Sequence, residues 1–438
     1  MYTPYKWIIF IFGILATMPV LEINIGFISI SAFRTMFFIV LVFVVIHSEF
    51  CLRVDFKNSF ITWMGWSLLS CLFGYIFFRN STMWQQASVS NITKILAYMM
   101  FFMVWLGQRE CDLKENNRVL INGLFLGAVA NIVWATLDAA CFYGAGFSLN
   151  NIVFAKYGAT HDVIYGTVSL IINNGQMIRS GGFNYDPAHL GFLIPCVIGY
   201  GFVKKRYIYV ILGGLGIIAS ASTTALVCAM IVIVACSTIS MGRNAITGKR
   251  VIETILGILV ILFILLYFGE RIIPLIRQAT ILFENRVKSV YVASDVNNIR
   301  LEYIRYLPVA IIELGPLVLL GTGYGTASYG YCHNSYIADA LNIKNVPYDM
   351  ENTYIAYLLD TGIVGFVIFA YMIISLYSYY RKNVDYSEEN IIIFVILTST
   401  LSSMLFYHYI LFVPQILVMI IAYSDRKYVN NKQINNRV

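Results

Sequence analysis

The stretch that decides the fold is Thr353–Tyr380, which reads TYIAYLLDTGIVGFVIFAYMIISLYSYY and contains one charged residue, Asp360. An α-helix needs about 20 apolar residues to cross a bilayer, so this run is long enough to do so. The run Val251–Gly269 has the same character, with Glu253 as its one acidic residue. Only 12% of the whole chain is charged, whereas soluble domains average about 25%. The sequence therefore predicts an all-α polytopic membrane protein.

At about 17–25 apolar residues per span, the chain is predicted to form about twelve transmembrane helices in one helical domain covering residues 1–438. These helices are expected near residues 7–21, 32–47, 60–78, 92–108, 119–143, 187–203, 207–220, 222–240, 251–269, 354–380, 390–406 and 408–423. The first of them follows Lys6 and lacks a signal-peptide cleavage pattern, so it is expected to remain as a helix.

The Lys and Arg residues predict the orientation of the spans. With the N-terminus inside, each predicted cytoplasmic segment carries at least one basic residue, among them Lys6, Arg118 and Lys204, as the positive-inside rule requires. An even number of spans then places both termini in the cytoplasm. Scattered clusters of this kind are typical of membrane topology, so the net charge of +7 does not predict nucleic-acid binding.

Two outer segments carry basic residues that topology does not explain. They are residues 145–186 and the larger segment 270–352, between the ninth and tenth helices, and both are predicted to be structured. Their basic residues are Lys156, Arg179, Arg271, Arg277, Arg286, Lys288, Arg300, Arg305 and Lys344. An anionic ligand outside the membrane is therefore expected.

The first candidate motif is Arg179-Ser-Gly-Gly-Phe-Asn-Tyr-Asp186-Pro187-Ala-His189. Pro187 suits the first turn of a helix and Asp186 suits its N-cap. The positive end of that helix and Arg179 could hold an anion together. The Gly-Gly pair suits a close backbone approach to a ligand. The alternative is a capped helix with an interfacial arginine.

The second motif contains Arg300, Glu302 and Arg305 and continues through an apolar run to the glycine-rich turn Gly321-Thr-Gly-Tyr-Gly325. On a helix, the two arginines are splayed by roughly 140°, so they could hold different oxygens of one diphosphate, or one alone could reach it. Glu302 could pair with Arg305. The alternative is an interfacial helix anchored by its arginines at lipid headgroups.

The third motif begins Glu351-Asn-Thr-Tyr354, where the chain re-enters the bilayer. Glu351 is either a helix-capping carboxylate or a general base that takes a proton from a sugar hydroxyl. His333 is a second candidate base, although a lone loop histidine is usually structural. Asp138 and Asp360 lie inside predicted spans, where ionisable residues are functional suspects. No His, Cys or Asp cluster has the spacing of a metal site, and none is predicted.

These three motifs resemble those of the O-antigen polymerase (Wzy) family and its relatives, the O-antigen ligases. The resemblance implies an inverting, metal-independent glycosyltransferase without a cofactor that uses undecaprenyl-diphosphate-linked repeats in lipopolysaccharide biosynthesis. It implies a multi-pass protein of the bacterial inner membrane, with its active site facing the periplasm and a chain-length-regulator protein as a partner.

The resemblance also implies roles for particular residues. Arg179, Arg300 and Arg305 would bind the diphosphate. Glu351, His333 and Asp186 are the catalytic candidates. Asn352, Tyr354 and His189 are candidates for binding the glycan. The ligases have a His before the Asn of the third motif, so Glu351 favours a polymerase, whereas His333-Asn-Ser-Tyr-Ile keeps a ligase open. A flippase for the same lipid-linked glycan is a further alternative, which would favour midplane charges and paired broken helices.

Overall fold

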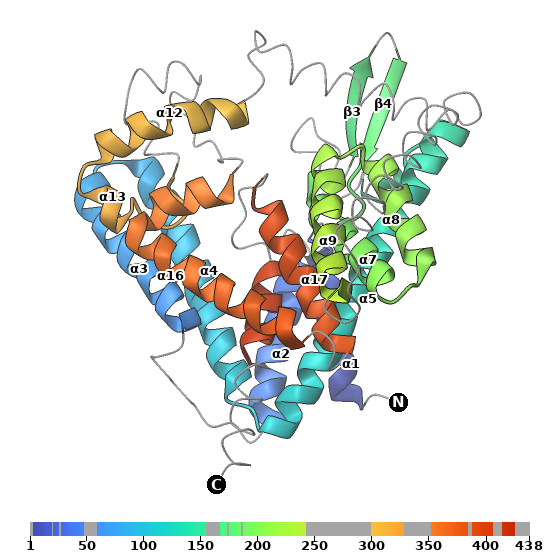
Figure 1. The fold of residues 1–438 in the computed structure, drawn as a ribbon, viewed down its shortest axis with the longest axis horizontal. Coiled ribbons are helices and arrows are strands. Elements are labelled where there is room, and N and C mark those ends of the chain that lie inside the picture. The colour runs from blue at the N-terminus through green and yellow to red at the C-terminus, as the bar shows by residue number, and fades with distance from the viewer. Residues whose placement is uncertain are drawn as a thin grey trace. The chain divides into compact units, whose positions relative to one another are not determined.

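The computed structural model describes residues 3–19, 21–25, 28–47, 59–154, 167–172, 175–184, 187–241, 299–327, 352–383, 388–405 and 414–424. Most of these residues are helical (Figure 1). Among them, four helical segments are long and apolar enough to cross a membrane: Ser59–Phe78, Ala87–Leu106, Glu110–Ala145 and Thr353–Asn383. Six shorter helices are also strongly apolar.

The helices in chain order are α1 (Pro4–Ala16), α2 (Ala32–His47), α3 (Ser59–Phe78), α4 (Thr82–Leu106), α5 (Glu110–Ala145), α6 (Leu149–Phe154), α7 (Leu190–Val203), α8 (Tyr207–Ser220), α9 (Thr223–Met241), α12 (Ile299–Leu314), α13 (Leu317–Leu320), α16 (Thr353–Asn383) and α17 (Glu388–Ser403). A further apolar helix covers Pro414–Ser424. Each predicted span except 251–269, which lies outside the described residues, coincides at least in part with a described helix.

Helices α4 and α7 begin at residues other than those predicted. α4 begins at Thr82 rather than near residue 92, because the Ser81 hydroxyl accepts a hydrogen bond from the Trp84 amide at 3.3 Å. A serine at this position satisfies an amide that the first turn leaves without a partner. α7 begins at Leu190, after a 3-10 turn at Pro187–His189, rather than at Pro187 itself.

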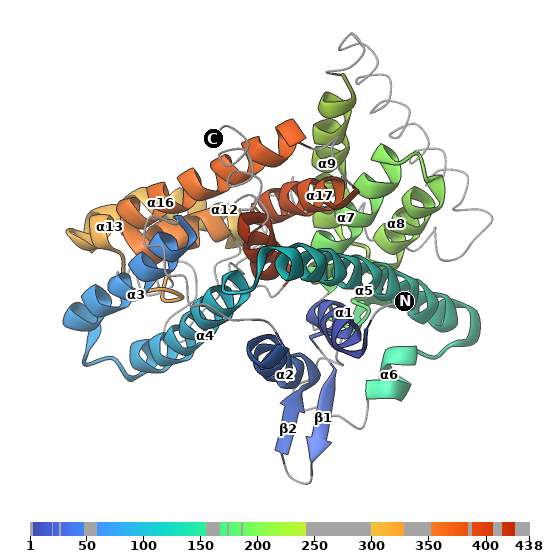
Figure 2. The same ribbon diagram turned by 90° about the horizontal axis from the view of Figure 1, so that it is seen from below.

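Two short antiparallel hairpins accompany the helices. Strands β1 (Glu22–Ile25) and β2 (Ile28–Ser31) join α1 to α2, with Glu22 opposite Ser31 (Figure 2). Strands β3 (Thr167–Ile172) and β4 (Gly175–Ser180) lie in the predicted outer segment 145–186, with Thr167 opposite Ser180. The described part of that segment is therefore structured, as predicted, although it adds strands to a fold predicted to be all-α.

The chain divides into two compact units. The first comprises Met1–Phe43, Lys114–Tyr291 and Tyr380–Ser403, and the second comprises Val44–Leu113, Val292–Tyr379 and Met404–Val438. Of the residues that the structure describes, Arg179 and its motif belong to the first unit. The second unit holds α12, the Gly321–Gly325 turn and most of α16.

In the first unit, glycines allow α1 and α5 to pack closely. A Cβ at Gly13 would lie 2.7 Å from the Leu120 carbonyl oxygen, and a Cβ at Gly123 would lie 2.3 Å from the Phe10 oxygen. Gly127 meets α1 one turn further along, where its Cβ would lie 2.9 Å from the Ile14 oxygen. This is the spacing of small residues that lets membrane helices approach backbone to backbone. Figure 2 shows α1 next to α5.

α7 is the central helix of the first unit. Residues Leu190 to Gly201 are buried, and α7 packs against α8, α9 and α17. The Ser399 hydroxyl of α17 donates a hydrogen bond to the Phe192 carbonyl oxygen at 2.7 Å. The first motif ends where α7 begins. The packing of α7 therefore fixes the position of the C-terminal end of that motif.

In the second unit, aromatic side chains join α3 to α16. The rings of Trp63 and Phe369 lie 5.6 Å apart, and those of Tyr357 and Phe369 lie 4.8 Å apart. All three side chains are buried. The Ser67 and Tyr357 hydroxyls share a hydrogen bond of 3.1 Å, so the polar tip of the tyrosine is satisfied inside this core.

Candidate functional site

The first motif begins on β4, which places Arg179 beside the end of α8. The Tyr143 hydroxyl donates a hydrogen bond to the Ile178 carbonyl oxygen at 3.0 Å and accepts one from the Ile178 amide at 3.2 Å, so α5 holds the strand. The Arg179 Nε donates to the carbonyl oxygen of Ser220, the last residue of α8, at 3.1 Å. A cation is favourable at the negative end of a helix. The strand and the helix end together therefore fix the position of the guanidinium.

The Gly-Gly turn after Arg179 is held by Asn131 of α5. Gly182 has a φ of +63°, and a Cβ there would lie 2.7 Å from the Asn131 carbonyl oxygen. The Asn131 side-chain oxygen accepts hydrogen bonds from the Phe183 amide and the Asn184 side chain, both at 3.0 Å. Its amide nitrogen donates to the Thr17 carbonyl oxygen of α1 at 2.9 Å. The close approach that the glycines permit is therefore to α5.

Asp138, a suspect because it lies inside a span, supports the same turn. It is fully buried, and its Oδ1 accepts hydrogen bonds from the Ser148 hydroxyl at 2.7 Å and the Asn150 amide at 3.1 Å. These groups lie at the start of α6, so the carboxylate caps that helix. The Asn150 side chain then donates to the Gly182 carbonyl oxygen at 3.3 Å. The buried carboxylate thus supports the first motif through α6.

The second motif lies on α12, whose first two turns contain Arg300 and Arg305. The helix lies above the start of α16 in the view of Figure 1. Its Ala310 and Leu314 form a buried cluster with Ala356 and Leu359 of α16. The remaining buried members are Leu317 and Ala327. The helix predicted between residues 285 and 320 thus has a described part that ends at Leu314, before Gly315, whose φ is +53°.

The glycine-rich turn predicted after this helix is present, and it packs into a break in α16. Gly321, Gly323 and Gly325 all have positive φ, which L-residues with a side chain rarely adopt. α16 is interrupted at Gly362, with φ +67° and ψ −179°. A Cβ at Gly362 would lie 2.2 Å from the Leu319 oxygen. The glycines of the second and third motifs therefore meet backbone to backbone.

Hydrogen bonds fix the turn in this break. The Thr322 and Gly323 amides donate to the carbonyl oxygens of Leu359 and Asp360, both at 2.9 Å. The Asp360 Oδ1 accepts a further hydrogen bond from the Thr326 amide at 2.8 Å. An interrupted helix leaves carbonyl groups without intrahelical partners, and here the turn supplies the missing donors.

The first residues of α16 carry the described part of the third motif. The Asn352 side-chain oxygen accepts a hydrogen bond from the Ile355 amide at 3.1 Å, so Asn352 caps α16, a role that the sequence suggested for Glu351. The Asn352 side-chain nitrogen donates to the Leu405 oxygen at 3.2 Å, and Tyr354 is half-buried in the first turn. Glu351 lies outside the described residues.

Other predicted site residues are placed only in part. His333 and Asp186 lie outside the described residues, as do the segments 270–298 and 328–351. His189 ends the 3-10 turn that precedes α7. For Arg300 and Arg305, the structure describes the position on α12 and not the side-chain contacts. Arg179, Asn352, Tyr354 and His189 are thus the candidates whose surroundings are defined.

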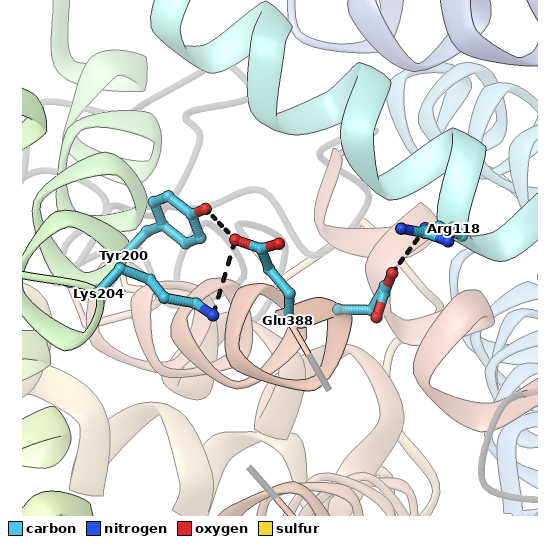
Figure 3. Close-up of polar contacts among 5 residues, drawn as sticks. Arg118, Tyr200, Lys204 and Glu388 are labelled. Carbon is cyan, nitrogen blue, oxygen red and sulfur yellow. Dashed lines mark hydrogen bonds and ion pairs between the residues drawn. The ribbon is translucent and has the colours of Figure 1, made fainter. Parts of the chain in front are cut away.

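A polar cluster that the sequence analysis missed lies at the opposite end of the first unit from the β3–β4 hairpin. Glu388, at the start of α17, accepts a hydrogen bond from the Tyr200 hydroxyl at 2.5 Å and lies 3.7 Å from the Lys204 Nζ (Figure 3). The next residue, Glu389, pairs with the Arg118 Nε at 2.8 Å. The sequence does contain a signal for this cluster. Two adjacent glutamates stand at the start of a predicted helix, in a region where the predicted cytoplasmic segments are rich in basic residues.

The Tyr200 hydrogen bond and the positive charges of Lys204 and Arg206 lower the pKa of the Glu388 carboxyl below its ordinary value. Lys6 pairs with Glu115 at the same end of α5. The residues Lys6, Arg118 and Lys204, each predicted to be cytoplasmic, therefore form ion pairs within one end of the unit.

The long apolar helices and their glycine-mediated packing define a multi-pass membrane protein. Residues 208–370 match the O-antigen ligase family (Wzy_C), which confirms over that segment the resemblance drawn from the motifs. The match includes Arg300, Arg305, the Gly321–Gly325 turn and the start of α16, whereas Arg179 precedes it. A comparison with curated proteins found no match.

Proposed function

We propose that this protein is an inverting, metal-independent glycosyltransferase that polymerises undecaprenyl-diphosphate-linked O-antigen repeat units at the periplasmic face of the bacterial inner membrane. The observation that carries the proposal is the match of residues 208–370 to the O-antigen ligase family within a multi-pass membrane protein. That match supports a role in the transfer of lipid-linked glycans. The presence of Glu351, where the ligases carry a histidine, favours a polymerase over a ligase.

In the proposed reaction, the growing glycan is the donor and a new lipid-linked repeat is the acceptor. Glu351 removes the proton of the acceptor hydroxyl while the oxygen attacks the anomeric carbon of the donor. The bond between that carbon and the diphosphate oxygen breaks, and undecaprenyl diphosphate leaves with the electron pair. A single displacement inverts the anomeric centre.

The proposed role of Arg179, Arg300 and Arg305 is to bind the diphosphate as negative charge develops on the leaving oxygen. A guanidinium suits this task because it remains charged and offers paired donors to phosphate oxygens. Two arrangements support the assignment. Arg179 is held by β4 and the end of α8, and α12 is packed onto the start of α16. Cationic groups on such fixed supports need little reorganisation during the reaction.

Deletion of the gene tests the proposal through the surface polysaccharide on a gel. A polymerase mutant retains lipid A-core that carries a single repeat, whereas a ligase or flippase mutant carries none. Restoration of the ladder by the wild-type gene, but not by Glu351→Gln with equal membrane abundance, would support Glu351 as the base. Glu351→Asp keeps the carboxylate and serves as the matched variant. A full ladder from Glu351→Gln would remove Glu351 from the mechanism.

The ligase alternative rests on His333 and the family's description, and the same gel separates it from a polymerase. The flippase alternative gains one feature from the structure, because α16 is broken at Gly362 next to the buried Asp360. However, the carbonyl groups of that break and one carboxylate oxygen accept hydrogen bonds from the Gly321–Ala327 segment. Because these acceptor groups already have partners within the protein, the break in α16 is better explained as a structural feature than as a transport site.

A further inference from the structure

Asp360 is a carboxylate inside a membrane-crossing helix, and the proposed reaction does not use it. It is 2% exposed and stands two residues before the break at Gly362. An ionisable residue at such a position is costly, so a role is expected. Its Oδ1 accepts a hydrogen bond from the backbone amide of Thr326 at 2.8 Å.

We propose that Asp360 is a positioning residue for glycan transfer, which locks residues 321–327 into the break of α16 and so holds α12 in register with the start of α16. This inference rests on the proposed function, because α12 and the start of α16 carry the predicted diphosphate and glycan residues. Asp360 acts as a hydrogen-bond acceptor and not as a proton carrier.

Residues 321–327, here called the lock loop, form hydrogen bonds to three acceptors in α16, namely the carbonyl oxygens of Leu359 and Asp360 and the carboxylate of Asp360. The Thr322 amide and hydroxyl both donate to the Leu359 carbonyl oxygen, and the Gly323 amide donates to the Asp360 carbonyl oxygen, so on α16 the first two contacts involve backbone atoms only. In the third contact, the Thr326 amide donates a hydrogen bond to the carboxylate of Asp360. This third bond is the one that a side-chain substitution can remove selectively.

The other face of the lock loop is held by α3 and α4. The Trp84 indole nitrogen donates to the Thr322 carbonyl oxygen at 2.9 Å, and the Tyr324 amide donates to the Cys71 sulfur at 3.3 Å. A Cβ at Gly74 would lie 1.9 Å from the Thr322 oxygen, so α3 approaches the loop closely. The loop is therefore enclosed by three helices of one compact unit and cannot shift without displacing backbone.

The lock loop follows α12 and α13 directly in the chain, so its position fixes where that pair of helices ends. Ala327 joins Ala310, Leu314, Ala356 and Leu359 in one buried cluster. A loop displaced from the break would carry Ala327 away from this cluster and loosen α12 from α16. Displacements of about 1 Å in a reacting arrangement can lower a rate by about 100-fold.

If Asp360 acts as a hydrogen-bond acceptor, its replacement by asparagine and its replacement by alanine should have different effects. Asp360→Asn keeps a side-chain oxygen for the Thr326 amide, whereas Asp360→Ala removes it and leaves a buried N–H without a partner. A proton carrier would lose its function in both variants, because neither side chain titrates. Phe369→Leu is the control for general destabilisation, since Phe369 packs on Trp63 and Tyr357 and makes none of the lock hydrogen bonds.

The experiment measures polymerisation by the purified full-length protein in nanodiscs with lipid-linked repeats, together with hydrogen exchange of residues 321–327. We expect Asp360→Ala to lower kcat by about 10- to 100-fold and to accelerate exchange of the Thr326 amide. Asp360→Asn should stay within about threefold of wild type in both measurements, because the acceptor oxygen remains. Phe369→Leu should lower thermal stability while its kcat per folded molecule stays near that of wild type.

Three results would overturn the positioning role: wild-type kcat in Asp360→Ala, equal loss in Asp360→Asn and Asp360→Ala, or an equal kcat loss in Phe369→Leu at matched stability. A wild-type protein that polymerises nothing would overturn the proposed function and the positioning role with it. The exchange data would still decide the lock separately, since unchanged Thr326 exchange in Asp360→Ala would refute the hydrogen bond itself.

Discussion

Replacement of Gly362 by alanine should disrupt the break in α16 more than any conservative change on the surface of that helix. Gly362 has φ +67° and ψ −179°, a region that is essentially restricted to glycine. Forcing a side chain into such a region costs about 1–3 kcal/mol. The added Cβ would also lie 2.2 Å from the Leu319 oxygen and 2.7 Å from the Gly321 nitrogen, which are backbone atoms.

The clash can be relieved only if the end of α13 and the lock loop move away from α16. That movement would break the two backbone hydrogen bonds from Thr322 and Gly323, each worth about 0.5–1.5 kcal/mol. Together with the backbone strain, the loss of unfolding free energy for Gly362→Ala should be about 2–6 kcal/mol. The matched control is Gly65→Ala in α3, where a Cβ would meet no atom within 4 Å. That variant should be neutral or stabilise the protein by up to about 1 kcal/mol.

Unfolding in mixed detergent micelles, followed by intrinsic fluorescence, gives the free energies of wild type and both variants. Tryptophan emission suits the measurement, because Trp84 donates a hydrogen bond to the lock loop and Trp66 donates one to Thr361. If Gly362→Ala unfolded at the same detergent concentration as Gly65→Ala, the reasoning from the left-handed backbone and the close contact would be refuted.

Three further outcomes are expected. Asn131→Ala should lower the unfolding free energy by about 1–3 kcal/mol, because the partly buried Phe183 amide loses its acceptor, and limited proteolysis should then cut the first motif more readily. The pKa of Glu388 is lowered in the folded state, so its contribution to stability is complete above the unfolded-state pKa and disappears as the pH falls through the folded-state value. Wild type should therefore lose more stability than Glu388→Gln between pH 7 and about pH 3, and equal losses would count against the Tyr200 hydrogen bond. Arg179→Ala should abolish long glycan chains at normal protein abundance, with poor rescue by Arg179→Lys; a normal ladder from both would exclude Arg179 from diphosphate binding.

Hydropathy was a good guide to the helices because a bilayer demands long apolar segments whose backbone groups are satisfied internally. The run that contains α8 was predicted with the same ends as the helix itself, since a basic turn precedes it and a serine-rich turn follows it. The hairpin of β3 and β4 was not foreseen as strands. The sequence does carry a signal for it, because the run Val168–Ile172, rich in β-branched residues, is followed by Asn173-Asn174-Gly175, a typical hairpin turn, and the prediction overlooked this pattern.

The candidate site was predictable in residue type but not in role. Asp138 and Asp360 were candidate functional residues because charge is costly in a membrane. The carboxylate of each instead accepts a hydrogen bond from a backbone amide of a neighbouring segment. The break at Gly362 could not be read from an apolar run, where a single glycine is compatible with an unbroken helix. Its partner, the turn at Gly321, lies far away in sequence, and only the folded chain brings the two together.

α5 has 36 residues and a length of about 54 Å, well beyond the roughly 30 Å of a hydrocarbon core. Its two ends make different contacts, since Arg118 near its start pairs with Glu389 of α17, while Tyr143 near its end holds β4 at Ile178. One residue inserted between them would rotate everything beyond it by about 100°. The number of residues between these two contacts therefore sets the angle between them, and an insertion or deletion there would disrupt one contact even if both contacting side chains were kept.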